Sequence, residues 1–116
     1  MKPYDLEERT FLFAKDCKNY IRSLSKTTSN IEDGKQLIRS SDSVGANYIE
    51  ANEKLGDKDL VFRLKISRKE AKESKYWLRL LHELNPDQRS ASDSLIFEIE
   101  ELRKILSAII TKTTKQ

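Results

Sequence analysis

The chain has few of the residues that most often carry catalysis or covalent cross-links. Its 116 residues include one cysteine, one histidine and three glycines. A single cysteine excludes a disulfide within the chain. With one histidine and no Gly-rich phosphate loop, the chain lacks the residues that usually carry out hydrolysis or phosphoryl transfer. We therefore predict a protein that is not an enzyme and that needs no cofactor.

Glycine and proline are scarce together, with three and two residues, while charged residues make up 35% of the chain and hydrophobic ones 37%. A chain with few helix-breaking residues and many good helix formers favours helices over a sheet rich in turns. The length fits one domain of ordinary size. We expect residues 1–116 to form a single all-α domain.

Long apolar runs are absent as well. The first eight residues lack the apolar stretch of a signal peptide, and no window approaches a membrane span. We expect a cytoplasmic protein without membrane contact. Cys17 shares a predicted helix face with apolar residues, which indicates a buried and inert thiol.

Apolar spacing and capping residues predict four helices joined by short links. Asp5 and Ser29 are the expected N-caps of the first two helices, because each is followed three residues later by a glutamate. Gly56 suits a helix stop, and Asp57 suits the next cap. The expected helices are about 6–24, 29–55, 58–84 and 92–111. Short links between four helices predict an antiparallel, up-down-up-down four-helix bundle.

The middle of the second helix is small and partly polar, and it contains Gly45, where helix propensity alone favours a break. We predict an unbroken helix, because small residues permit close approach by a neighbour; a kink is the alternative. Counting outward from the link at Gly56 places Ser67 opposite Gly45 and Ala71 opposite Ser41. The second and third helices are therefore expected to pack with small residues facing each other.

Two E-x-x-E motifs, Glu50/Glu53 and Glu70/Glu73, raise the possibility of a di-metal site of the kind found in carboxylate bundles. The antiparallel pairing separates the two motifs by about 12 Å. The single histidine, His82, fits neither motif. We predict no metal site.

The same pairing favours a structural role for these carboxylates. It places Arg63 opposite Glu50 and Arg39 opposite Glu73. We expect these to be partly buried ion pairs that fix the register of the two helices, at some cost in desolvation.

The third predicted helix carries a row of basic residues at spacings of three and four, which places them on one face. These residues are Lys65, Arg68, Lys72, Lys75 and Arg79. Such a row can bind phosphates with release of counterions, and Lys35 and Arg39 are expected to assist. The alternative is an ordinary solvated surface that Glu70, Glu73 and acidic residues of neighbouring helices neutralise further.

Several aromatic residues remain to be explained. Three phenylalanines point away from the apolar seams of their helices: Phe11, Phe62 and Phe97. We predict that they form contacts between subunits. Tyr48, Tyr76 and Trp77 could offer stacking surfaces, although aromatic residues at helical spacing usually belong to a core.

Four segments of the chain resemble a known family. They are residues 5–10 (DLEERT), 34–41 (GKQLIRSS), 43–51 (SVGANYIEA) and 68–78 (RKEAKESKYWL). They are similar to the four-helix-bundle proteins encoded by intervening sequences in bacterial 23S ribosomal RNA genes, sometimes labelled S23 ribosomal proteins. The resemblance covers nearly the whole chain.

This resemblance implies a left-handed four-helix bundle that commonly assembles into a ring-like homopentamer. Related accessory proteins of diversity-generating retroelements share the bundle and act with a reverse transcriptase and nucleic acid. No catalytic activity is established for the family at large, and it offers no established functional residues to transfer.

The leading hypothesis is a non-enzymatic oligomeric bundle that binds RNA or another nucleic acid through the basic row. The alternative is a protein-interaction scaffold with no nucleic-acid role. A metal-dependent enzyme is a distant third.

Overall fold

The computed structural model describes residues 2–53 and 55–115, apart from the side chains of residues 3 and 4. The described part contains four α-helices and one 3-10 turn, and no strand. They are α1 (Pro3–Ser23), α2 (Thr28–Ala51), α3 (Asp57–Leu84), η1 (Pro86–Gln88) and α4 (Arg89–Thr114).

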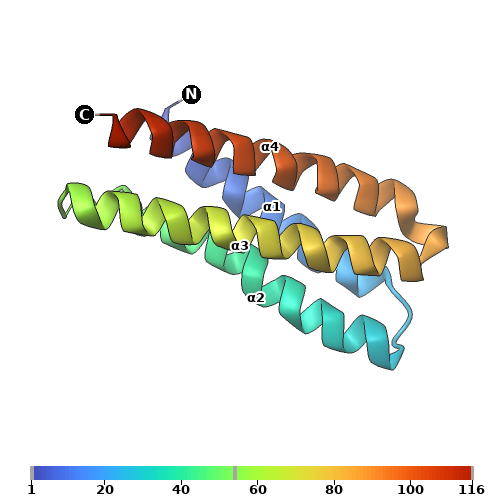
Figure 1. Cartoon of the computed structure of the whole chain (residues 1–116). Helices are drawn as coiled ribbons and strands as arrows, with labels where there is room; N and C mark the ends of the chain where they lie inside the picture. Colours follow the sequence, from blue (N-terminus) through green and yellow to red (C-terminus); the bar gives the residue numbers. More distant parts are fainter. Residues whose placement is uncertain (1, 54, 116) are drawn as a thin grey trace.

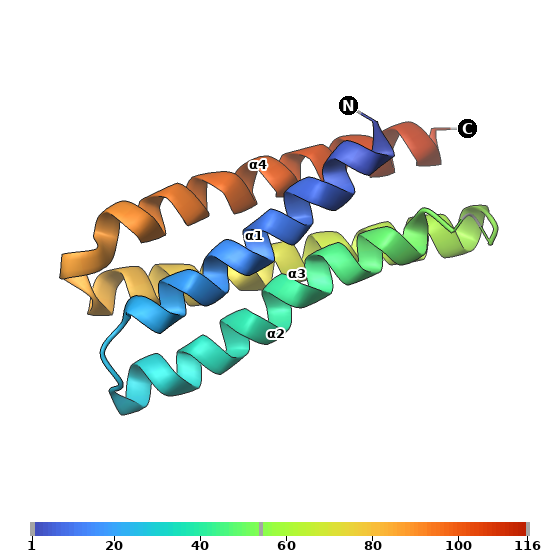
Figure 2. The same cartoon turned by 180° about the vertical axis from the view of Figure 1, so that it is seen from behind.

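Each α-helix packs against two neighbours, in the cyclic order α1, α2, α3, α4, and α3 packs most extensively, against α2 and α4. Consecutive helices run in opposite directions, and both ends of the chain lie at the same end of the molecule (Figures 1 and 2). The molecule measures 47 × 20 × 19 Å. The predicted all-α four-helix bundle is confirmed. The left-handed sense that the resemblance implies stays a prediction.

The core follows from apolar residues repeated every three or four positions, which place one face of each helix inside the bundle. Large side chains from all four helices are fully buried: Leu6, Phe13, Leu37, Leu64, Leu78, Leu81, Ile99, Leu102 and Leu106. Cys17 is buried among them, and this desolvation raises the pKa of its thiol. No helix in the described ranges is long and apolar enough to cross a membrane.

The first two helices begin earlier than predicted. Helix α1 starts at Pro3 with Lys2 as the N-cap, and the Asp5 carboxylate lies in the first turn, where it accepts from the Lys2 backbone N at 3.3 Å. Helix α2 is capped by Thr27, whose Oγ1 accepts from the Asn30 backbone N at 3.1 Å. The predicted caps at Asp5 and Ser29 were therefore wrong, because a proline at the first position and a preceding threonine start the helices sooner.

Other helix ends also differ from the predicted ones. Helix α2 ends at Ala51 rather than near residue 55, and Gly56 precedes α3 as its N-cap, with φ of +148°. That backbone conformation is open essentially only to glycine. Helix α4 extends from Arg89 to Thr114, three residues further at each end than predicted.

Helix α2 continues unbroken through Gly45, as predicted, but its small residues serve two neighbours. Ser40 and Val44 face α3: the Ser74 Oγ donates to the Ser40 Oγ at 2.9 Å, and the Ser67 Oγ donates to the Val44 carbonyl at 2.7 Å. Gly45 faces α1 instead, where it meets Thr10. The predicted contact of Ser67 with Gly45 was thus wrong by one residue, because one step along a helix rotates the contact by about 100°.

Candidate nucleic-acid interface

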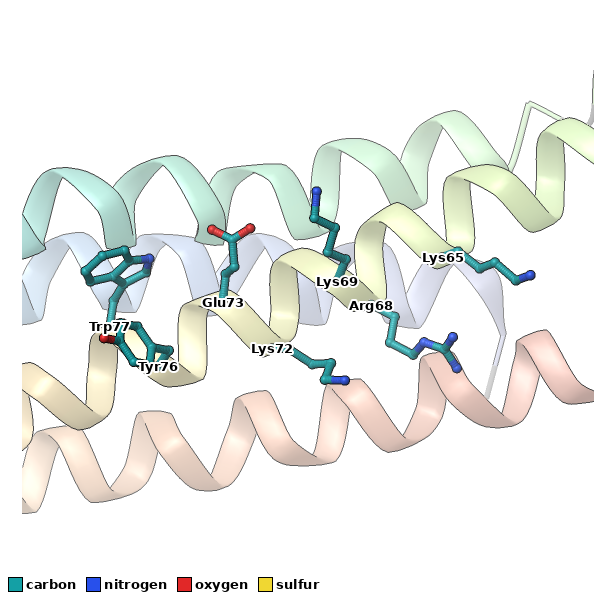
Figure 3. Close-up of a pocket in the computed structure, with 7 residues that line it drawn as sticks. All are labelled: Lys65, Arg68, Lys69, Lys72, Glu73, Tyr76 and Trp77. Carbon is teal, nitrogen blue, oxygen red and sulfur yellow. The ribbon is translucent and has the colours of Figure 1, made fainter.

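The predicted basic row lies on the outer surface of α3. Lys65, Lys72 and Arg79 are exposed, and Arg68 and Lys75 are half-buried. Figure 3 shows Arg68 and Lys72 directed toward α4. Helices α2 and α4 flank α3, and the row lies on the side of α3 that these two neighbours leave open to solvent.

Contacts with α4 hold two of these cations. The Lys75 Nζ lies 3.4 Å from Glu100 Oε1, and Arg103 donates two hydrogen bonds of 2.9 Å to the same carboxylate. The hydrogen bonds from Arg103 and then Lys75 lower the pKa of Glu100 to about 2. The Arg68 Nη1 lies 3.4 Å from the Ser107 Oγ. Lys75 is therefore partly neutralised, and Arg68 is held in place.

Four further cations along this surface of α3 have no carboxylate partner in the part of the chain that the structure describes, and Lys58 at the start of the helix has none either. The four are Lys65, Lys69, Lys72 and Arg79. Unpaired, solvated cations keep their full charge for an external anion. These four residues, with Arg68 and Lys75, are called the basic face below.

The basic face borders a hollow of about 440 Å³ (Figure 3). Its lining is Lys65, Arg68, Lys69, Lys72, Glu73, Tyr76 and Trp77. The Tyr76 side chain is 55% exposed. Its ring meets the Trp77 ring edge-on, with the centroids 5.0 Å apart at 80°. The hollow thus combines four cations, one carboxylate and an accessible aromatic ring.

A second hollow of about 290 Å³ lies further along α3 and shares Lys72 and Tyr76 with the first. Its remaining lining is Lys75, Arg79, Glu100 and Arg103. Tyr76 is therefore a wall common to both hollows. Cations from α3 and α4 surround it.

Sequence reasoning missed three of these features. Lys69 was left out of the predicted row, although spacings of four and three also connect it with Lys65 and Lys72. Arg103 lines the second hollow from α4, and no pattern within α3 could indicate it. The exposure of Tyr76 depends on which side of α3 is left uncovered by α2 and α4.

The two α2 residues that were expected to assist phosphate binding line neither hollow. Lys35 is exposed, and its Nζ lies 3.7 Å from Glu32 of its own helix. Arg39 bridges to α3, with its Nη2 at 2.8 Å from Glu73 Oε1 and its Nη1 at 3.6 Å from Glu70 Oε1. Arg39 is therefore engaged with carboxylates rather than free to bind phosphate.

The Arg39–Glu73 pair has the predicted partners but not the predicted burial. The Arg39 side chain is 53% exposed, whereas the buried carboxylate is Glu70, with 9% of its side chain exposed. Arg39 lies beside both acids of this E-x-x-E motif, so its guanidinium offsets part of their charge. Within the described ranges, no group of three or more His, Cys, Asp or Glu residues is placed to hold a metal ion.

The predicted Glu50–Arg63 pair was wrong. The Arg63 Nε lies 3.7 Å from Asp59 one turn earlier, and its Nη1 lies 3.4 Å from the Asn47 Oδ1. Glu50 is exposed at the last turn of α2. Arg63 finds partners on its own helix and one turn back on α2, so it does not reach Glu50.

One cluster contains the residue types of a hydrolytic triad, which sequence reasoning did not foresee. The His82 Nδ1 lies 2.6 Å from the Ser92 Oγ, and its Nε2 lies 3.6 Å from Asp93 Oδ1. Ser92 is fully buried, and its hydroxyl also contacts the Arg89 carbonyl at 3.2 Å. With the serine hydroxyl buried and bonded to its own helix, this cluster joins the end of α3 to the start of α4.

The three phenylalanines predicted to contact other subunits are exposed. Phe11, Phe62 and Phe97 have exposed fractions of 62%, 57% and 69%. Phe11 and the exposed Ile49 border a groove of about 260 Å³ between α1 and α2. The Arg63 guanidinium lies over the Phe62 ring at 5.8 Å.

The comparisons with known proteins agree with this architecture. The family described as 23S rRNA-intervening sequence protein matches the chain over residues 4–108. The chain belongs to this family. This confirms the resemblance carried by the SVGANYIEA and RKEAKESKYWL segments.

A crystal structure from the S23 ribosomal protein family of Bacteroides thetaiotaomicron VPI-5482, described as a protein with unknown function, is similar to this member of the 23S rRNA-intervening sequence family. The two chains are 32% identical, with a TM-score of 0.85 over 96% of this chain and 99% of the other. No curated protein matches this sequence. The comparisons therefore show the family and the fold, and nothing in them indicates catalysis.

Proposed function

We propose that this protein is a non-enzymatic oligomeric bundle that binds RNA or another nucleic acid through the basic face of α3. The observation that carries the proposal is the gathering of Lys65, Lys69, Lys72 and Arg79 around an exposed aromatic ring. A groove of cations with an aromatic platform is the arrangement by which proteins bind nucleic acid without a fixed sequence.

Charge balance supports the basic face over the other surfaces. The chain carries a formal net charge of only +3, so its overall charge does not distinguish a binding surface. The first hollow concentrates four cations against the single carboxylate of Glu73, which Arg39 already pairs. A phosphate approaching this face meets local positive charge with little competition.

The experiment that tests the proposal is a salt titration. Affinity for a labelled RNA or DNA oligonucleotide of mixed sequence is measured by fluorescence anisotropy at several KCl concentrations. Four free cations predict that the logarithm of the binding constant falls with the logarithm of salt concentration with a slope of about −3 to −4, because each phosphate contact releases about 0.7 to 0.9 of a counterion. Absence of binding at low salt, or a flat dependence, would show that the basic face has no such role.

Self-association through the exposed phenylalanines is the second part of the proposal. Phe11, Phe62 and Phe97 lie on three different helices, and each is more than half exposed. Apolar surface distributed in this way is covered when several copies assemble, and the family resemblance implies five copies.

A protein-interaction scaffold is the second candidate function. The observation in its favour is the same set of exposed phenylalanines, with the groove beside Phe11. A protein that is retained on the bundle after nuclease treatment, together with a failed salt titration, would favour the scaffold.

A further inference from the structure

We propose that the basic face accepts single-stranded nucleic acid, with an unpaired base stacked on the Tyr76 ring. This inference rests on the proposed function and names the form of nucleic acid that the same surface selects. Its distinguishing features are the position of Tyr76, the support that Trp77 gives it, and the placement of charge around the first hollow.

Tyr76 is placed to stack against a ligand rather than to fill the core. The residue is 55% exposed, the hollows around it are lined mainly by charged residues, and it forms the shared wall of both hollows. Its ring contacts Trp77 edge-to-face, and more than half of the residue is open to solvent. Its π-face is available to any flat group that enters a hollow.

Trp77 holds this ring in position. It is partly buried and packs against the core, while its indole meets Tyr76 in an edge-to-face arrangement. A ring braced in this way loses little conformational freedom when a base stacks on it. Bracing of this kind strengthens binding because less ordering is needed when the ligand binds.

The charges separate a place for phosphate from a place for a base. Lys65, Lys69 and Lys72 border the first hollow, whereas Glu73 contributes a carboxylate to its wall. A phosphate inside the hollow would be repelled by that carboxylate. A neutral base would not be repelled, and its amino group can donate to Glu73. Phosphates therefore fit the lysine rim, and a base fits the hollow (Figure 3).

The dimensions suit a strand that runs along α3. Lys65 and Arg79 are fourteen positions apart, which is about 21 Å along a helix. A single strand can lay several phosphates along this row and turn a base inward at Tyr76. In a duplex both faces of each base are covered by its stacked neighbours, so a duplex would contact the cations and leave Tyr76 unused.

The test compares one labelled oligonucleotide of about twelve nucleotides as a single strand and annealed to its complement, at the same salt concentration. The parent protein should bind the single strand at least about fivefold more tightly. Tyr76→Ala should weaken single-strand binding at least about fivefold, leave duplex binding unchanged and leave the salt slope unchanged, because a base stacked on an aromatic side chain contributes about 1–3 kcal/mol. Tyr76→Phe should retain the parent affinity.

The controls separate stacking from loss of fold. Ile31→Ala removes another exposed apolar side chain, on α2, and should leave both affinities unchanged. Thermal melts monitored by circular dichroism verify that each variant is folded. Trp77 is the only tryptophan, so quenching of its fluorescence by the single strand reports a base in the first hollow.

Two results would overturn different claims. Salt-dependent binding that is equal for single strand and duplex, or a folded Tyr76→Ala variant with the parent's single-strand affinity, would contradict stacking and leave the proposed function standing. Absence of salt-dependent binding to either form would contradict the proposed function, and the stacking site with it.

Discussion

Replacing Gly45 with valine should lower the free energy of unfolding by about 2–4 kcal/mol. A Cβ at this position would lie 3.0 Å from the Thr10 Oγ1 and 3.3 Å from the Thr10 Cβ. Thr10 is fully buried, and its hydroxyl donates to the Glu7 carbonyl at 2.9 Å, so it has little room to move. Valine adds two further carbons at this contact and forces α1 and α2 apart.

Alanine at the same position is expected to have a much smaller effect. Its single methyl group needs a shift of only a few tenths of an ångström, and alanine favours the helix over glycine by about 1 kcal/mol. The steric cost of the methyl group and the gain in helix propensity therefore oppose each other. The contrast between Gly45→Ala and Gly45→Val therefore isolates the steric contact from helix propensity.

Urea unfolding followed by circular dichroism measures this effect. Ala46→Val is the matched control, because Ala46 is exposed on the next position of α2 and the change also introduces a β-branched residue. Adding Thr10→Ala to Gly45→Val should recover part of the lost stability, since it removes the atoms in conflict. Equal losses for Gly45→Val and Ala46→Val would mean that α1 and α2 do not approach closely at this point.

Reversing three charges of the basic face should weaken nucleic-acid binding by at least about 100-fold. The variant is Lys65→Glu, Lys69→Glu and Lys72→Glu, which changes cations that have no carboxylate partner among the described residues. A lysine near an anionic surface contributes about 1 kcal/mol, and reversal adds repulsion to that loss. Three such changes together exceed about 3 kcal/mol, which corresponds to more than about 100-fold in affinity.

Lys75 is left unchanged in this variant because it pairs with Glu100 at 3.4 Å, and its reversal would disturb the contact between α3 and α4. The matched control reverses Lys15, Lys26 and Lys112, three exposed lysines outside α3, and alters the net charge by the same amount. Anisotropy titrations at one salt concentration compare the variants. Similar losses in both would indicate that net charge alone, rather than the basic face, determines binding.

Much of the fold follows from local patterns in the sequence. The unbroken spacing of apolar and small residues from Leu60 to Leu81 predicts α3 with its buried face, and the structure buries Leu64, Ala71 and Leu78 as that spacing requires. The short link at Gly56 predicts the antiparallel packing of α2 and α3 and the contact between Arg39 and Glu73. These predictions succeed because each depends on periodicity within a helix and on the length of one link.

The rotation of α2 could not be predicted in the same way. Ser40, Ser41, Val44 and Gly45 are all buried and all small or medium-sized, so residue type alone does not indicate which of them meets which neighbour. These buried residues form two adjacent rows on α2, one packed against α3 and one packed against α1. The two rows are offset by one residue, so assigning a residue to one of them requires the positions of both α1 and α3.

The candidate site, too, could be predicted from the sequence only in part. The basic residues of α3 are visible in the sequence as a helical row, because spacing within one helix is enough to align them. Contacts between helices decide which of them remain free: Glu100 of α4 engages Lys75, whereas Lys69 and Lys72 have no such partner in the described ranges. The exposure of Tyr76 is likewise set by what α2 and α4 leave uncovered.

Hydroxyl-radical footprinting with mass spectrometry tests the central claim, that nucleic acid covers the outer face of α3, most directly. Side-chain oxidation is compared in the free protein and with saturating single-stranded oligonucleotide at low salt. The account predicts strong protection of Tyr76, with Phe11 and Phe97 unchanged. Protection of those phenylalanines with Tyr76 still oxidised as in the free protein would place the nucleic acid elsewhere and contradict the account.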